Sequence, residues 1–82
     1  MLIFTIKQVV RHKGTICIGT VECNEIKPRD KVYFNGREGM IFAIDRHFQL
    51  VESAQKGQEV GILIRGWSDV EIQEGDQLED RM

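Results

Sequence analysis

The feature that most constrains the fold is a series of short apolar runs, rich in β-branched residues, separated by turn signals. Ten Ile and seven Val stand against four Leu and two Ala. Because β-branched side chains suit a pleated surface and good helix formers are scarce, the chain is predicted to be mostly strand. The polar–apolar alternation of Phe4-Thr5-Ile6-Lys7 is typical of a strand.

Seven extended runs are predicted, over residues 2–10, 15–23, 31–34, 40–48, 49–54, 59–65 and 77–79. Asn35-Gly36 is the strongest hairpin signal, and Gly19 within a strand indicates a bulge or a close backbone approach. Residues 67–73 have no clear period, and one helical turn is expected there. Six or seven short strands separated by turns predict an all-β fold, a small β-barrel.

The size and charge of the chain limit its function. Its 82 residues carry eleven Lys and Arg against thirteen Asp and Glu, a net charge of −2. We therefore expect a single domain over residues 1–82 and no indiscriminate nucleic-acid binding, which needs a basic face. No run is long enough for a membrane span or a signal peptide, so the expected location is cytoplasmic. Cys17 and Cys23, about 20 Å apart on one strand, are expected to be free thiols.

No residue pattern supports catalysis. The spacing from Gly14 to Gly19 imitates part of a phosphate-binding loop, but Thr20 stands where the essential lysine belongs. Asp45 and His47 have no nucleophile at a matching spacing. The two histidines and two cysteines fit no zinc pattern. We expect a protein that is not an enzyme and that holds no metal and no cofactor.

Three features are candidates for binding. Arg11-His12-Lys13 is a compact basic loop that could hold a phosphate, with an ordinary solvated turn as the alternative. Arg46-His47-Phe48 combines a cation, a hydrogen-bonding ring and an aromatic face, which suits an unpaired base, although Phe48 could equally belong to the core. Trp67 could anchor a partner or cover one open end of the barrel.

The motifs, in their order, resemble the second domain of translational GTPases, the β-barrel of elongation factor Tu and the initiation factor. The first half carries Lys13-Gly14-Thr15, Gly19, Val21-Glu22, Ile26-Lys27 and Asp30-Lys31-Val32. The second half carries Ala54, Gly57, Val60-Gly61-Ile62-Leu63-Ile64-Arg65-Gly66, Ile72, Gly75-Asp76 and Leu78. The match runs from about Phe4 to Leu78 and implies a closed, six- to seven-stranded Greek-key β-barrel. Arg29 replaces the glycine of the family's K-x-G-D pattern, which indicates a different turn.

The resemblance also implies a kind of ligand. In elongation factor Tu this barrel helps to hold the 3′ end of aminoacyl-tRNA, partly through a Glu-Met-Phe-Arg stretch that here reads Asp45-Arg46-His47-Phe48. An Asn before the Val-Gly pair is Glu59 here, which adds a carboxylate. The 82 residues leave no room for a GTPase domain, so this chain alone is not expected to bind GTP.

The leading hypothesis is a translation-factor-like barrel that is not an enzyme and binds RNA, either tRNA or rRNA, or a ribosomal surface. The proposed contacts are Arg11, His12, Lys13, Arg46, His47, Arg65 and Trp67. Arg65 could instead hydrogen-bond turn carbonyls at the end of its strand. The alternative is a module that binds a protein partner or forms a homo-oligomer, because small size and edge strands favour association. A membrane is not an expected partner.

Overall fold

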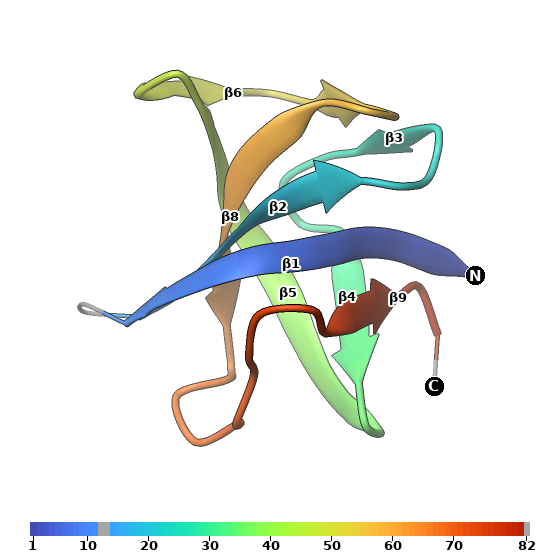
Figure 1. The fold of residues 1–82 in the computed structure, drawn as a ribbon, viewed down its shortest axis with the longest axis vertical. Helices are drawn as coiled ribbons and strands as arrows, with labels where there is room; N and C mark the ends of the chain where they lie inside the picture. The colour runs from blue at the N-terminus through green and yellow to red at the C-terminus, as the bar shows by residue number, and fades with distance from the viewer. Residues whose placement is uncertain (12–13, 82) are drawn as a thin grey trace.

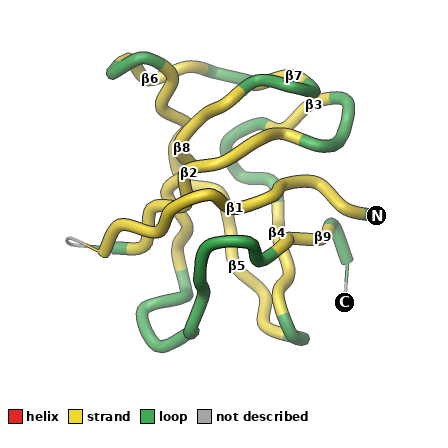
Figure 2. The backbone as a smooth tube through the Cα atoms, in the orientation of Figure 1, coloured by secondary structure: helices red, strands yellow, loops and turns green. Residues whose placement is uncertain are grey.

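The computed structural model describes residues 1–11 and 14–81, and in this part of the chain it contains strands but no helix (Figures 1 and 2). The strands are β1 (Leu2–Arg11), β2 (Thr15–Val21), β3 (Glu25–Ile26), β4 (Lys31–Phe34), β5 (Arg37–Arg46), β6 (Gln49–Val51), β7 (Ala54–Gln55), β8 (Glu59–Arg65) and β9 (Gln77–Glu79). The all-β prediction is confirmed. No helix long and apolar enough to cross a membrane occurs among these residues.

Six of these strands close into a barrel. The order β4-β9-β1-β2-β8-β5 is completed by pairing of β5 with β4, and β6 extends β5 outside the ring. Every pairing is antiparallel. Strands β4, β5 and β8 are successive neighbours in the barrel. Strand β2, which precedes them in the chain, lies beside β8, and this order is a Greek key. Strands β3 and β7 make a separate two-stranded sheet.

Gly19 allows the closest backbone contact in the barrel. A Cβ atom at this position would lie 1.9 Å from the carbonyl oxygen of Thr5 on β1. The register between β1 and β2 shifts beside this point, because Ile6 pairs with Gly19 and Gln8 pairs with Ile18. The bulge bends β1 so that it pairs with β9 as well as β2. Of the two alternatives predicted for Gly19, the close backbone approach is confirmed, whereas the bulge lies opposite, between Ile6 and Gln8 of β1.

Two turns show how local sequence sets the backbone. Asn35 and Gly36 have φ angles of 51° and 78° and join β4 to β5 as the predicted tight hairpin. In the turn at residues 27–30, the Asp30 N–H donates to the Lys27 carbonyl at 3.1 Å. Arg29 has a φ of 83° there, the conformation that a type II turn requires at its third position. The prediction of a different turn is therefore wrong, because Arg29 adopts the backbone that glycine favours.

The barrel interior is filled by apolar side chains from the strands and from the loop between β8 and β9. The largest fully buried residues are Trp67, Phe4, Ile6, Ile26, Ile41, Ile44, Ile62 and Leu78. A Cβ at Gly39 would lie 2.7 Å from Trp67 Cε2, so the indole packs directly on the β5 backbone. The prediction of a helical turn at residues 67–73 is wrong. The Val70 N–H donates to the Trp67 carbonyl at 3.3 Å in a single turn, and no helix follows.

The segment after β5 differs from its predicted course. The predicted strand over residues 40–48 begins earlier, at Arg37, and ends at Arg46. His47 and Phe48 form a two-residue turn into β6. The run predicted over residues 49–54 is divided into β6 and the start of β7. Phe48 therefore lies at a hairpin tip, outside the core.

Replacing Gly19 tests the close approach of β1 and β2. Gly19→Ala is expected to lower the free energy of unfolding by about 1–3 kcal/mol, because the new methyl group meets backbone that cannot move aside. Gly61→Ala is the matched control, since its Cβ would find only ordinary contacts at 3.6 Å or more. Urea denaturation monitored by Trp67 fluorescence measures both variants. Equal stability of the two would contradict the constraint.

The two thiols, both free as expected, differ in burial. Burial raises the pKa of Cys17 to about 11, an effect that the charge of Arg11 only partly offsets. Almost no thiolate forms at pH 8, so Cys17 is expected to react with a thiol reagent only after unfolding. Half-buried Cys23 is expected to react faster in the folded protein. Mass spectrometry after timed alkylation measures the order, and modification of both at one rate would contradict it.

Candidate functional site

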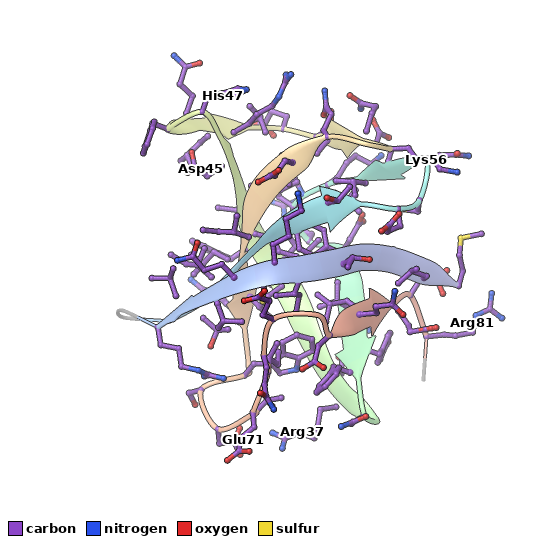
Figure 3. All side chains as sticks on the ribbon, viewed as in Figure 1. Arg37, Asp45, His47, Lys56, Glu71 and Arg81 are labelled. Atoms are coloured by element: carbon purple, nitrogen blue, oxygen red, sulfur yellow. The ribbon has the colours of Figure 1, made fainter. Side chains whose placement is uncertain are left out.

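The β5–β6 hairpin projects from one end of the molecule and carries an exposed aromatic ring. Figure 3 shows Asp45 and His47 at this end, opposite Arg37 and Glu71. His47 and Phe48 have φ angles of 54° and 64°, the left-handed pair that a two-residue hairpin of this kind requires. A bulky residue rarely adopts such a φ, and Phe48 is 99% exposed. The fold therefore accepts a strained backbone at Phe48 and leaves its ring in solvent.

An open depression lies beside this hairpin, on the outer face of β1, β2 and β8. Its volume is about 570 Å³, and it is lined by Val10, Ile16, Ile18, Asp45, His47, Phe48, Glu59, Val60 and Gly61. The register explains why these residues meet. Val10 pairs with Ile16, Ile18 pairs with Gly61, and Gly61 pairs with Asp45. Side chains from three neighbouring strands and the hairpin therefore surround one hollow.

The floor of the depression is apolar because β2 is apolar on both faces. Its inward positions are buried, and Ile16 and Ile18 occupy half-buried outward positions. Gly61 between them leaves the floor open, since a Cβ there would lie 3.6 Å from Ile16 and 3.7 Å from Ile18. An apolar floor with an exposed ring above its edge is suited to a flat, partly apolar ligand.

Carboxylates stand among the cations around the depression. Asp45 and Glu59 line it. Lys7 Nζ lies 3.0 Å from a Glu59 carboxylate oxygen, so this charge is balanced in part. Arg46 and His47 are exposed at the hairpin. The surface here is mixed in sign rather than one continuous basic face.

Arg11, a predicted contact, is engaged within the fold. Its Nη1 donates to Thr15 Oγ1 at 3.1 Å and to the Trp67 carbonyl at 3.2 Å, and its Nη2 donates to the Val70 carbonyl. Thr15 Oγ1 also donates to the Trp67 carbonyl, at 3.2 Å. Arg11 thus ties the β8–β9 loop to β1 and β2. Its predicted neighbours His12 and Lys13 lie outside the described residues.

The other predicted contacts do not gather at the depression. Arg46 and His47 lie at the hairpin, whereas Arg65 lies at the end of β8 with its guanidinium 3.9 Å from the centroid of the Phe42 ring. Arg65 thus stacks on an aromatic ring, and no hydrogen bond to a turn carbonyl is found for it among the described residues. Trp67 is completely buried, so the prediction of an exposed anchor is wrong and the core alternative holds.

Sequence reasoning missed the residues that form the floor. The sequence analysis predicts Ile16 and Ile18 only as part of a strand, although the run Ile16-Cys17-Ile18 places apolar residues on both faces. That two-sided pattern is the signal that could have revealed them. No cluster of His, Cys, Asp or Glu suited to a metal ion occurs in the described part of the chain.

Comparison with known proteins decides the family. The family model of elongation factor Tu domain 4 matches residues 2–79 of this chain. This chain belongs to the elongation factor Tu domain 4 family. The resemblance to a β-barrel of the translational GTPases is therefore confirmed, but the assignment to the second domain is corrected to domain 4.

Proteins named elongation factor 1-alpha are similar to the chain. Elongation factor 1-alpha of Methanococcus maripaludis (strain C5) is 39% identical over 67 residues, which are 79% of this chain and 16% of that protein. Elongation factor 1-alpha of Cenarchaeum symbiosum is 36% identical over 69 residues, 82% of this chain and 16% of that protein. The chain therefore spans about one sixth of the length of the curated relatives it matches.

Replacing Arg11 separates a structural role from a binding role. Arg11→Met is expected to lower the free energy of unfolding by about 1–3 kcal/mol, because the buried carbonyls of the β8–β9 loop lose a charged donor. Arg46→Met is the matched control, since Arg46 is exposed and should change stability by less than about 0.5 kcal/mol. Urea denaturation measures both. Equal effects would contradict the structural role.

Proposed function

We propose that this elongation-factor-like barrel binds the single-stranded 3′ end of an RNA, such as a tRNA, in the depression beside the β5–β6 hairpin. The observation that carries the proposal is the exposed ring of Phe48, held on a strained backbone at the edge of an apolar hollow that Asp45 also lines. Backbone strain concentrates at functional sites, where the fold holds a side chain in place against its own preference.

The chemistry of a terminal nucleoside matches the hollow. An unpaired base has a flat face that stacks on an aromatic ring and packs against apolar side chains such as Ile16 and Ile18. The Asp45 carboxylate accepts hydrogen bonds from the 2′ and 3′ hydroxyls of the ribose, and these two are free together only at a 3′ end. In this proposal, Arg46 and His47 at the same hairpin bind the single phosphate that precedes this nucleoside.

This arrangement answers the objection that two carboxylates repel an RNA. A terminal nucleoside presents hydroxyls rather than phosphate on its 3′ side, and Glu59 is paired with Lys7. We expect the affinity for RNA to change little with salt concentration, because only one or two phosphates are neutralised. Of the predicted contacts, Arg46 and His47 belong to the proposed site, whereas Arg65 and Trp67 do not.

The family supports this proposal at a coarser level. The relatives are named elongation factors, and the chain matches about one sixth of their length, so no activity of the whole factor is carried over. We propose binding alone, with no catalytic step. The proposed location is the cytoplasm, where translation occurs.

Self-association is a second candidate with its own observation. Leu50 on β6 is 78% exposed next to the tip that carries Phe48. Among the described strands β6 pairs only with β5, so its other edge is open to a strand from another chain. A homo-oligomer formed through this hairpin would cover both apolar side chains.

Binding of short RNAs by fluorescence anisotropy tests the proposal. Phe48→Gly removes the ring and relieves the backbone strain, so it should preserve stability and weaken binding about tenfold or more, from the loss of one stacked base. Leu50→Ala is the matched control, because Leu50 lies on the same hairpin but does not line the depression. An RNA with a 3′-phosphate should bind less well than one with a free 3′ hydroxyl, and Asp45→Asn should remove this difference.

Two results would contradict the RNA proposal. One is the absence of binding at low salt, and the other is equal binding by the Phe48→Gly variant. Light scattering on the same samples distinguishes the second candidate. An oligomer that dissociates in the Phe48→Gly or Leu50→Ala variant would support self-association.

A further inference from the structure

Positively charged side chains line a groove on the other edge of β5. On this edge, Met40 pairs with Lys31 of β4 and Ile44 pairs with Val51 of β6. Between the two strands the turn at residues 27–30 meets β5, where the Arg29 N–H donates to the Ile41 carbonyl at 2.7 Å. The gap between β4 and β6 is a groove of about 600 Å³.

Three cations line the groove, with Glu52 as the one carboxylate among its lining residues. Lys27 Nζ lies 3.9 Å from Glu25, at the limit of an ion pair. Arg29 and Arg65 form no ion pair with any residue that the structure describes. The chain as a whole has a net charge of −2, so the groove is more positive than the chain as a whole.

Arg29 holds its place in the groove against backbone preference. Its φ of 83° is the conformation that glycine adopts freely and that side chains rarely adopt. The turn would form more readily with glycine. What arginine adds at this position is a guanidinium group on the wall of the groove, and strain retained for a charged side chain points to binding.

The apolar parts of the groove indicate what kind of anion it accepts. Leu50 is 78% and Phe42 47% exposed, and Met40 and Val51 are half-buried. Arg65 covers one face of the Phe42 ring, with its guanidinium 3.9 Å from the ring centroid. Stacking of RNA bases needs a free aromatic face. The groove therefore favours a partner that brings carboxylates and apolar side chains together.

We propose that the groove lined by Lys27, Arg29 and Arg65 docks an acidic polypeptide segment that carries apolar side chains between its carboxylates. Arg29 and Arg65 bind the carboxylates through charge-assisted, bidentate hydrogen bonds. Leu50, Val51 and the exposed edge of Phe42 contact the apolar side chains. The groove is separate from the depression, which lies on the other edge of β5.

The probe for this site is a short, dye-labelled peptide in which glutamates alternate with leucine and phenylalanine. Fluorescence anisotropy measures its binding. Arg29→Gly removes a cation and relieves the turn, so the melting temperature should be kept while the dissociation constant rises about tenfold. Arg65→Gln should weaken binding to a similar extent. Arg46→Gln is the matched control, because it removes an exposed cation outside the groove and should leave peptide binding unchanged.

A second peptide with glutamine in place of every glutamate should not bind. Equal binding of this neutral peptide, or unchanged affinity in the Arg29→Gly variant, would overturn the proposal. A single-stranded RNA that competes for the groove and loses affinity in Arg29→Gly would overturn it in favour of a nucleic acid. Phe48→Gly should not alter peptide binding, so this test stands apart from that of the RNA site.

Discussion

The contact between the β1 backbone and Gly19 is the constraint on which the rest of the barrel depends. The Thr5 carbonyl oxygen occupies the space that a side chain at residue 19 would need. This contact accompanies the bulge that bends β1 toward β9 and closes the ring. Closure in turn sets β2 beside β8, and the outward face of these two strands becomes the floor of the depression.

The positive charges of the chain divide into structural and available ones. Arg11 is committed to the β8–β9 loop, where it donates to the backbone carbonyls of Trp67 and Val70. Arg37 is paired with Asp69 at 3.0 Å, and this guanidinium lowers the pKa of that carboxyl. Other cations are exposed to a ligand, among them Arg46 at the hairpin tip and Arg29 in the groove. A count of basic residues in a sequence therefore overstates the charge that a ligand can meet.

Left-handed backbone at residues other than glycine marks both candidate surfaces. Asn35 adopts it in an ordinary hairpin and needs no further explanation, because asparagine tolerates this conformation. Phe48 and Arg29 tolerate it poorly, and each directs its side chain to the wall of a hollow. In both cases the turn would be more relaxed with glycine. The strain is compensated by the pairing of the flanking strands.

The all-β fold, the hairpin at Asn35-Gly36 and the close approach at Gly19 can be predicted from the sequence, because each depends on local backbone preference or on alternation along one strand. The run of family motifs also predicted the barrel. The burial of Trp67, the structural role of Arg11 and the exposure of Phe48 depend on tertiary contacts. The tertiary structure alone showed the depression and the groove. These depend on which strands become neighbours and with what register, and such contacts join residues far apart in the chain, where local preference carries no information.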